Sequence, residues 1–418
     1  MYERECVSID GLVNEYGSPL FLVSANRLRS NLRDFKDKFL SRYPRVEAAY
    51  AYKANSLPEL LAIIHKEGAW AEVGSGFEYE LARSLRVPGK SIVFNGPYKK
   101  KEELKRAVRD GALINVDNED ELGLLGEISE ELGCTVEIGL RINMDVGIRQ
   151  KRDRFGFSLE SGEAEEAIRS CKRDGLLRVA GFHVHLTSYI VESGTSGDAV
   201  PAGRIKLIWP KGADMYRAAA EKMVRFANGI RAEYGAGIKY LDFGGGFPSV
   251  DSLYPYVSCV VEPVIDSLEG DLPLLILEPG RAIVKDAVDL IATVVGVRDF
   301  PEGRSVVIDA GINILPTSFW RYQDIEPLVY RDTDIKETTV YGPLCLQTDI
   351  VAEAKLPALS PGDRLLIPGV GAYNIPQSSA FMFPRPYILL LEDGRVEVLR
   401  YPDIPHGESI PSGNIAHA

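Results

Sequence analysis

The regular alternation of short apolar runs with amphipathic stretches, from about residue 20 to residue 285, most constrains the fold of this 418-residue chain. The apolar runs have the length of buried strands; they are Leu20–Val23, Ala48–Tyr52, Ser91–Phe94, Leu113–Val116, Thr135–Ile142, Val179–Val184, Ile238–Phe243 and Leu274–Glu278. Helical patterns separate them, at 28–39, 58–66, 100–110, 119–132, 163–174 and 215–234. This alternation predicts a (β/α) barrel with parallel strands, with an open doubly wound sheet as the alternative.

After residue 285 the pattern changes to short strands separated by proline and glycine turns. Strand patterns cover 288–298, 305–309, 338–341, 364–368, 387–391 and 395–400. Such spacing is typical of a β domain, to which the N-terminal residues can add a strand. We therefore predict a TIM-like α/β barrel over 26–285 and a C-terminal all-β domain over 286–418 that is completed by 1–25.

The composition excludes several classes of function. The net charge of −12 argues against non-specific binding to nucleic acid or to an anionic membrane. The charged N-terminus has no apolar signal core, and no run approaches the ~18 apolar residues that span a bilayer. The scattered cysteines include no CxxC pair, which favours a reducing compartment over a disulfide framework or a zinc site; they are Cys6, Cys134, Cys171, Cys259 and Cys345. We expect a cytoplasmic protein.

Three motifs directly follow predicted strands, where a barrel carries its chemistry. Lys53 follows the run 48–52, and a desolvated lysine there can form a Schiff base with an aldehyde, although a surface lysine is the commoner case. Gly244–Gly246 lets backbone N–H groups approach a phosphate, or makes an ordinary turn. In Glu278-Pro-Gly-Arg281 the carboxylate could keep a pyridine nitrogen protonated and the arginine could bind a phosphate, or the two could pair.

Three further features gain meaning only beside these motifs. His183 and His185 alternate onto one side of a strand and point into the barrel, where they pack in the core or stack on a flat cofactor. Further metal ligands are not apparent near them, so no metal is expected. Cys345 lies between turn residues of the β half, as an acid or as a buried thiol. Tyr373 ends the turn Gly371-Ala-Tyr373.

Together and in this order, the motifs resemble those of the fold-type III pyridoxal-phosphate (PLP) decarboxylases, the group of diaminopimelate decarboxylase and eukaryotic-type ornithine decarboxylase. The resemblance extends from about residue 19 to residue 402. It implies a PLP-binding barrel of the alanine racemase type, a β domain that completes the active site, and a homodimer in which two subunits build each site. The implied activity is decarboxylation of a small-molecule amino acid through an external aldimine, a carbon–carbon lyase reaction.

The resemblance also implies a role for individual residues. Lys53 resembles the Schiff-base lysine, Glu278 the carboxylate that faces the ring nitrogen, and His185 the histidine that stacks on the cofactor. Cys345 resembles the cysteine that reaches over from the partner subunit and reprotonates the product. These four are the expected catalytic residues. Further cofactor contacts are expected from Glu72, where the family usually has Asp, and from Arg141, Ser188, Gly244, Gly245, Gly246, Arg281 and Tyr373.

The residues expected at the far end of the substrate depart from those of diaminopimelate decarboxylases. Those enzymes carry Cys-Glu-Ser, whereas Leu346 and Gln347 follow Cys345 here. By alignment, Thr317 and Arg321 replace an Arg and a Tyr that hold the distal end of the substrate. The residues expected to contact the substrate are Asp309, Arg321, Leu346, Gln347, Asp349 and Tyr373.

These departures predict an unusual substrate. A buried distal ammonium needs a carboxylate partner, which Leu346 cannot supply. Arg321, Gln347 and the long segment 187–214, which is functional or disordered, could instead accept a distal carboxylate, a citryl-like group or a carrier-linked acyl group. We therefore expect a diaminopimelate-like or modified amino acid, as in a siderophore or another specialised pathway.

Three alternatives stay open. The first is ordinary decarboxylation of meso-diaminopimelate in lysine biosynthesis. The second is an amino-acid racemase, which Glu278 disfavours because racemases of this barrel class typically place an arginine opposite the ring nitrogen. The third is a catalytically inactive regulatory homologue, against which the intact Lys53, Glu278 and Cys345 argue.

Overall fold

A computed structural model of the chain describes residues 7–147, 154–186, 189–191, 206–208, 212–235 and 237–403. The described residues form two compact units. The barrel unit contains those between 28 and 284, and the β unit contains 7–27 and 285–403.

Eight parallel strands form the barrel unit. They are β2 (Val46–Ala51), β3 (Trp70–Val73), β4 (Ile92–Phe94), β5 (Leu113–Val116), β6 (Val136–Asn143), β8 (Leu177–His183), β11 (Tyr240–Asp242) and β12 (Leu274–Leu277). Neighbours run in the order β5-β4-β3-β2-β12-β11-β8-β6, and pairing of β5 with β6 closes the ring. The predicted TIM-like barrel is confirmed, and the open doubly wound sheet is wrong.

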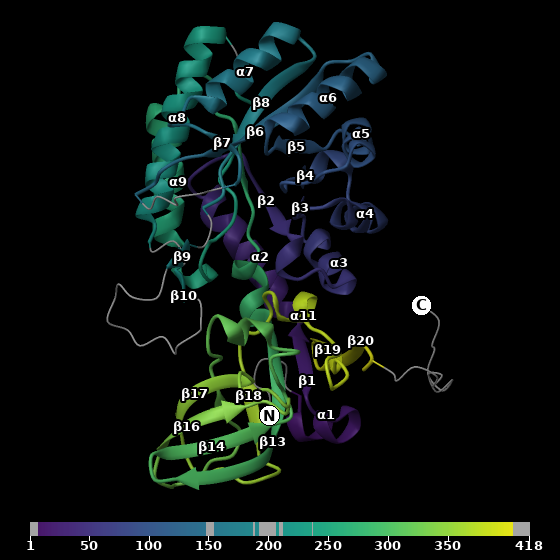
Figure 1. Ribbon diagram of the computed structural model, residues 1–418, viewed down its shortest axis with the longest axis vertical. Coiled ribbons are helices and arrows are strands. Elements are labelled where there is room, and N and C mark those ends of the chain that lie inside the picture. The colour runs from purple at the N-terminus through teal and green to yellow at the C-terminus, as the bar shows by residue number, and fades with distance from the viewer. Residues whose placement is uncertain are drawn as a thin grey trace. The chain divides into compact units, whose positions relative to one another are not determined.

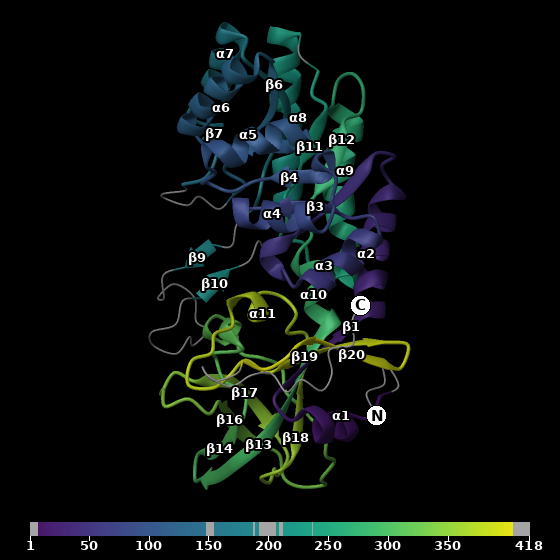
Figure 2. The same ribbon diagram turned by 90° about the vertical axis from the view of Figure 1, so that its right-hand side faces the viewer.

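Helices follow the strands and surround the ring (Figures 1 and 2). They are α2 (Ala25–Leu40), which begins in the β unit, α3 (Pro58–Lys66), α4 (Gly76–Ser84), α5 (Lys101–Asp110), α6 (Glu119–Leu132), α7 (Glu163–Asp174), α8 (Asp214–Tyr234), α9 (Tyr254–Ser267) and α10 (Arg281–Val284). Local signals define their ends. In α6, for example, the Asn118 side chain accepts a hydrogen bond from the Glu121 backbone N–H, and Gly133 ends the helix in the left-handed conformation.

Three short strands complete the barrel unit. β7 (Phe157–Ser158) pairs with the end of β6, and β9 (Tyr189–Val191) pairs antiparallel with β10 (Lys206–Ile208). Most of the segment 187–214, including Ser188, lies outside the described residues.

The amino-terminal ends of the barrel strands meet around the ring of Tyr240. This residue clusters with Ala49, Val93, Ala180 and Ile276, which are buried. A Cβ atom at Gly139 would lie 2.1 Å from the Tyr240 hydroxyl oxygen, and one at Gly181 would lie 2.5 Å from carbon atoms of the ring, so only glycine leaves room for this side chain. Small residues around one large ring therefore fill this end of the barrel, and the polar residues gather at the other end.

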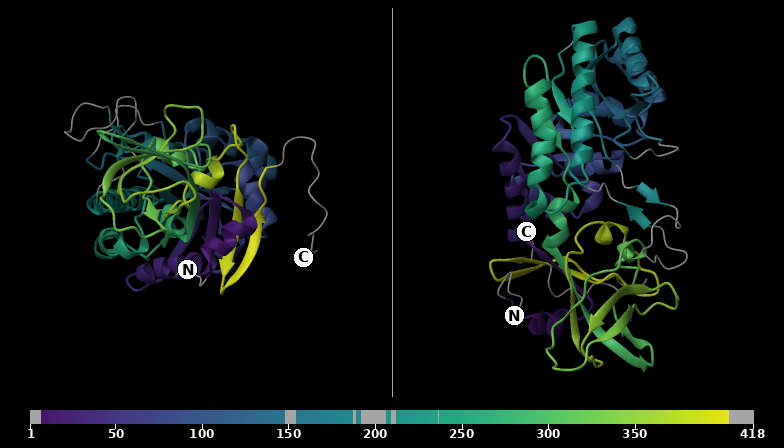
Figure 3. Two further views of the ribbon diagram at one scale, coloured as in Figure 1. Left: turned by 90° about the horizontal axis from the view of Figure 1, so that it is seen from below. Right: turned by 90° about the vertical axis from the view of Figure 1, so that its left-hand side faces the viewer.

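A mixed sheet forms the β unit. Its strands are β1 (Leu20–Ser24), β13 (Val288–Phe300), β14 (Gly303–Ile308), β15 (Glu326–Pro327), β16 (Lys336–Tyr341), β17 (Ile350–Leu356), β18 (Arg364–Ile367), β19 (Tyr387–Glu392) and β20 (Arg395–Arg400). The order β17-β16-β14-β13-β1-β19-β20 places the N-terminal strand β1 in the middle, and the yellow hairpin of β19 and β20 forms one edge (Figure 3). The expected all-β C-terminal domain is thus confirmed.

Two helices accompany this sheet, α1 (Ile9–Tyr16) and α11 (Asn374–Gln377). The apolar side of α1, formed by Ile9, Leu12 and Val13, packs against β1, β13 and β19. In the described part of the chain, no helix is both long enough and apolar enough to cross a bilayer.

Candidate active site

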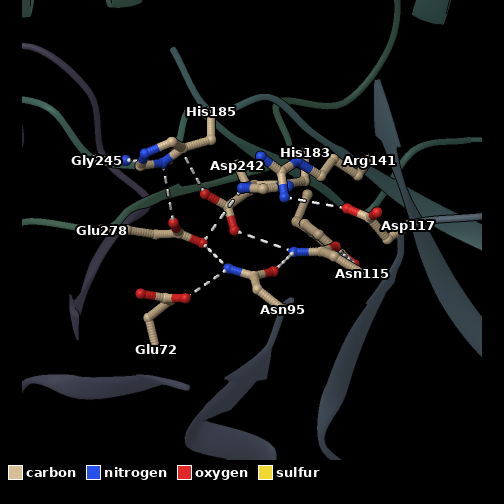
Figure 4. A network of polar contacts seen from close by, with 12 residues as sticks. Glu72, Asn95, Asn115, Asp117, Arg141, His183, His185, Asp242, Gly245 and Glu278 are labelled. Atoms are coloured by element: carbon tan, nitrogen blue, oxygen red, sulfur yellow. Dashed lines mark hydrogen bonds and ion pairs between the residues drawn. The ribbon is translucent and has the colours of Figure 1, made fainter. Parts of the chain in front are cut away.

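Polar side chains gather at the carboxyl end of the barrel, and every one of its eight strands contributes; Figure 4 labels them with the exception of Lys53. In chain order these residues are Lys53, Glu72, Asn95, Asn115, Arg141, His183, Asp242 and Glu278. Most of them are fully buried. A cavity of about 420 Å³ opens here, and it is lined by Lys53, Glu72, Arg141, His185 and Glu278 among others. The carboxyl end is where barrel enzymes carry their chemistry.

Lys53 lies in a single turn of 3-10 helix that follows β2. Its Nζ donates a hydrogen bond of 2.6 Å to Oε2 of Glu72, and the two side chains are 44% and 2% exposed. The turn packs closely on the end of β12, because a Cβ atom at Gly280 would lie 2.8 Å from Cβ of Ala54. The lysine amine is therefore both accessible from the cavity and oriented by a buried carboxylate.

Glu278 follows β12 and is almost completely buried. Its Oε1 accepts a hydrogen bond from Asn95 Nδ2 and lies 3.5 Å from Nε2 of His183. Its Oε2 is buried and has no hydrogen-bond donor among the described residues. Burial alone raises the pKa of Glu278, but His183, His185 and Lys53 outweigh it and hold the pKa well below its usual range.

Asp242, at the end of β11, is fully buried close to Glu278. It accepts hydrogen bonds from the Gly244 backbone N–H at 2.9 Å and from Asn115 Nδ2 at 3.3 Å. Burial and the neighbouring Glu278 raise its pKa well above the usual range. Two adjacent buried carboxyl groups do not both ionise, so Glu278 carries the negative charge and Asp242 is neutral.

The histidine at position 185 is held as a neutral ring. Its Nδ1 accepts a hydrogen bond of 3.0 Å from the Gly245 backbone N–H, which requires an unprotonated nitrogen there. Burial lowers the pKa of His185 to about 4, although Glu278 opposes the shift. The ring side chain is still 22% exposed toward the cavity that it lines.

The glycine turn wraps around this ring. Gly244 and Gly246 have φ values of +62° and +92°, which favour glycine. A Cβ atom at Gly244 would lie 2.8 Å from His185 Nδ1, and one at Gly245 would lie 2.5 Å from the Glu278 carbonyl oxygen. The three glycines thus let the backbone pass between the histidine and the end of β12.

Arginines provide further positive charge. Arg141 Nη1 bonds Asp117 at 3.0 Å, and its guanidinium lies 4.3 Å from the centre of the Phe155 ring. Arg281 begins α10, and its Nη2 is 3.5 Å from the Gly246 carbonyl oxygen. Arg281 therefore lies beside the glycine turn; its expected role toward a phosphate stays a prediction.

The other expected site residues lie in the β unit. Cys345, Leu346 and Gln347 form an exposed turn, whereas Asp349 is buried. The Asp349 carboxylate accepts backbone N–H groups of Ile312 and Leu344, both at 2.8 Å, and so holds the turn in place.

Three more expected residues of the β unit have defined surroundings. Asp309 accepts the Thr293 backbone N–H at 2.8 Å, and Arg321 forms an exposed ion pair of 2.9 Å with Asp324. Tyr373 adopts a left-handed conformation with φ +69° directly before α11. Their roles toward substrate or cofactor stay predictions.

Sequence reasoning missed Asn95, Asn115, Asp242 and the buried Asp117. The available signal was a polar residue within or directly after an apolar strand pattern, as with Asn115 in 113–116 and Asp242 in 238–243. Such a residue faces the barrel interior and must find a hydrogen-bond partner there.

The buried polar atoms identify what fits the cavity. Lys53 offers an amine for an aldehyde, Oε2 of Glu278 offers a buried acceptor for a protonated ring nitrogen, and the glycine turn offers backbone beside an arginine for a phosphate. One planar group uses all three features, and the barrel thus defines a PLP-dependent enzyme of the parallel-barrel class.

Comparison with known proteins agrees. Residues 26–204 match the family model described as pyridoxal-dependent decarboxylase, pyridoxal binding domain. The diaminopimelate decarboxylase of Aquifex aeolicus is 30% identical over 412 residues, covering 95% of this chain and 92% of the relative. That of Bacillus subtilis is 28% identical over 414 residues, 93% of this chain and 90% of its own. The crystal structure of the M. jannaschii diaminopimelate decarboxylase in complex with L-lysine superposes with a TM-score of 0.81 at 26% identity, covering 94% of this chain and 92% of that one.

The chain belongs to the fold-type III PLP-dependent decarboxylases, the family that includes diaminopimelate decarboxylase. It is a PLP-dependent amino-acid decarboxylase.

Proposed function

We propose that this decarboxylase acts on a diaminopimelate-like or modified amino acid whose far end carries a carboxylate or an acyl group. The observation that carries the proposal is the turn beside Cys345, where the apolar Leu346 is 42% exposed and no acidic residue follows the cysteine before Asp349. The carboxylate of Asp349 is already bonded to two backbone amides. A distal ammonium would lack a partner at this turn.

Two neighbouring residues support the same substrate class. The Thr317 hydroxyl donates to Asn374 Oδ1 at 2.7 Å and accepts from Gln323 Nε2 at 3.0 Å. Both of these hydrogen bonds are to side chains of the β unit itself. Among the described residues the Arg321 side chain forms an exposed ion pair with Asp324, and such a pair is weak enough to exchange its carboxylate for an anionic substrate group. The alternative substrate is meso-diaminopimelate, because relatives that match most of the chain are diaminopimelate decarboxylases.

The barrel residues have separate tasks in this proposal. When bound, PLP supplies a conjugated ring that spreads the negative charge left by the departing carboxylate. Lys53 holds the cofactor covalently through Nζ, and Glu72 orients that amine. Glu278, held as an anion, keeps a proton at the ring nitrogen through its Oε2. His185, held neutral, would pack on the ring. A neutral histidine adds no positive charge that would compete with the protonated ring nitrogen for the negative charge.

The glycine turn and Arg281 are proposed as the phosphate side of the cofactor site because they lie beside each other. Gly244, Gly245 and Gly246 line the phosphate together with Arg281. Because the N–H groups of Gly244 and Gly245 already donate to Asp242 and His185, the backbone donor proposed for the phosphate is the N–H of Gly246. Ser188 and Tyr373 are proposed for the same site from the family resemblance alone. Arg141, fixed by Asp117 and Phe155, lines the cavity and contributes positive charge to it. A phosphate accepts several such donors at once.

Cys345 is proposed as the acid that protonates the product, delivered from a second copy of the chain in a homodimer. Exposed apolar side chains in the β unit support an interface there; they are Phe319, Trp320, Leu346, Phe381, Met382 and Phe383. The thiol is exposed, as proton transfer requires. The free cysteines of the described residues also fit a reducing cytoplasm.

The substrate proposal is tested by assaying purified protein with PLP for CO2 release from a panel of amino acids, including meso-diaminopimelate and its N-acylated and citryl-linked relatives. We expect a modified member to give the highest kcat/KM. Strong turnover of meso-diaminopimelate with weak turnover of all modified members would overturn the substrate class and leave the decarboxylase assignment intact.

The role of Lys53 is tested without substrate. Borohydride should fix the cofactor as a mass increase on the peptide that contains Lys53. A Lys53→Ala protein that still yields a fixed adduct would show that another lysine holds the cofactor.

Mixing two inactive variants tests the shared site. Lys53→Ala and Cys345→Ala subunits, refolded together, should recover about a quarter of wild-type activity, because half of the dimers then contain one intact site of two. No recovery, with mixed dimers demonstrated by mass spectrometry, would place Cys345 in the site of its own subunit.

A further inference from the structure

A directional chain of hydrogen bonds crosses the carboxyl end of the barrel (Figure 4). Tyr240 OH donates to Asn115 Oδ1 at 2.8 Å, and Asn115 Nδ2 donates to Asn95 Oδ1 at 2.9 Å. Asn95 Nδ2 then donates to Oε1 of Glu72, at 3.1 Å, and to Oε1 of Glu278. All five residues are buried.

The direction of this chain follows from the two carboxylates at its end. An ionised carboxylate only accepts hydrogen bonds, so Asn95 must turn its NH2 toward Glu72 and Glu278. The side-chain carbonyl oxygen of Asn95 then faces Asn115, which must donate a hydrogen bond to it from its own NH2 group. The Asn115 oxygen in turn faces Tyr240, whose hydroxyl is left to donate. Burial raises the pKa of Tyr240 well above its usual value, which keeps that hydroxyl protonated.

One amide therefore serves both carboxylates in the same way. Glu72 uses Oε1 for Asn95 and Oε2 for Lys53. Glu278 uses Oε1 for Asn95, which leaves Oε2 as its buried oxygen without a hydrogen bond among the described residues. A donor shared by two buried carboxyl groups fixes the rotation of both.

We propose that Asn95 is a positioning residue that couples Glu72 with Glu278 and turns one oxygen of each toward the cofactor side of the cavity. The inference rests on the proposed roles of Lys53 and Glu278. It assigns to one asparagine the alignment of the two ends of the cofactor, the amine that holds it and the carboxylate that faces its ring nitrogen.

The test compares Asn95→Leu with a matched control, Asn31→Leu. Asn31 is an equally buried asparagine of the barrel unit, and its Nδ2 donates to the Ile283 carbonyl oxygen at 2.8 Å, away from the two carboxylates. Both changes remove a buried amide and lower the unfolding temperature. Only Asn95→Leu should also alter the titration of the site.

Two measurements on the holoenzyme distinguish positioning from packing. Without the Asn95 amide as donor, the Glu278 carboxylate becomes more basic. The acid limb of the plot of kcat/KM against pH should therefore move to higher pH by roughly one pH unit. In the absence of substrate, the ring-nitrogen signal of ¹⁵N-labelled PLP should shift toward the unprotonated form at neutral pH. The control should show neither change.

Asn95→Asp supplies a second variant of the same size if Asn95→Leu does not fold. Its carboxyl group has at most one O–H to donate, so it too should move the acid limb upward. An unchanged acid limb and an unchanged ¹⁵N signal in a folded Asn95 variant would overturn the coupling. Failure of wild-type protein to bind PLP or to release CO2 would instead overturn the proposed function on which the coupling depends.

Discussion

Lys99 and Glu121 form a buried ion pair in the barrel unit, with Nζ 2.6 Å from Oε1 and the side chains 0% and 5% exposed. Lys99 Nζ also donates to the carbonyl oxygens of Gly96, at 2.9 Å, and of Asn115, at 3.1 Å. Burial lowers the pKa of Lys99, although Glu121 opposes the shift. The pair thus anchors the backbone of Asn115, which belongs to the hydrogen-bond chain of the active site.

We expect Lys99→Met to destabilise the protein by about 3–5 kcal/mol, because Glu121 is left as an unpaired buried charge. The double variant Lys99→Met/Glu121→Leu should be clearly more stable than Lys99→Met alone. Urea denaturation measures both. Replacing Lys101, whose partners Glu127 and Glu131 are exposed, is the control and should have a much smaller effect. A double variant no more stable than the single one would contradict the argument.

His185 should make stability depend on pH. Its folded-state pKa of about 4 lies below the ordinary value of 6.5, so the unfolded state binds more protons between these values. The contribution is fully present above pH 6.5 and is lost as pH falls toward 4, by about 3 kcal/mol in all. Denaturation of the cofactor-free protein across pH 4–8 should show this slope in wild type and a smaller slope in His185→Gln. Equal slopes would show that the ring is not held neutral.

Asp242→Asn should fold and bind PLP, because asparagine imitates the neutral carboxyl group. The raised folded-state pKa means that the favourable contribution of Asp242 is present below pH 3.8 and is lost as pH rises through the folded-state value. The variant should therefore gain stability relative to wild type as pH increases from 4 to 8. Thermal unfolding measures the difference; a loss of stability at pH 8 would indicate that Asp242 is ionised and needed as an anion.

Gly245→Ala should weaken PLP binding roughly tenfold or more, because 1.4 kcal/mol of strain already has that effect. The new Cβ would lie 2.5 Å from the Glu278 carbonyl oxygen and 3.3 Å from His185 Cε1, so the end of β12 must move. Gly229→Ala, in α8 with nothing within 4 Å of the new Cβ, is the control and should leave binding unchanged while raising stability by up to about 1 kcal/mol. Fluorescence titration of apoprotein with PLP compares them. Equal affinity in the two variants would show that the turn is not near the cofactor.

Much of the fold could be predicted from local patterns. The expected helices at 58–66, 119–132 and 163–174 agree with α3, α6 and α7 to the residue. Among the elements that these patterns did not predict, β3 and α9 have identifiable reasons. β3 (Trp70–Val73) is only four residues long and includes Glu72, so it gave no apolar run. α9 contains Pro255 in its first turn and Pro263 inside it, and prolines are read as helix breakers.

The residues of the candidate active site likewise fall into those that the sequence could predict and those that it could not. Lys53, the glycine turn and Glu278 could be predicted, because each stands directly after a strand and its residue type suits one chemical task. Asn95 and Asp242 could not, because their importance depends on neighbours that come from other strands. Asn95 matters only because Glu72 and Glu278, 206 positions apart by their numbers, both lie within reach of its amide.

The sequence by itself determined the barrel, the β unit, the class of cofactor and the candidate residues at strand ends, since these depend on periodicity and on the order of motifs along the chain. Only the tertiary structure decided how charge is distributed among those residues. Glu278 is ionised, while Asp242 and His185 are neutral, because burial penalises every charge and the donors and acceptors at the carboxyl end of the barrel determine which charge is retained.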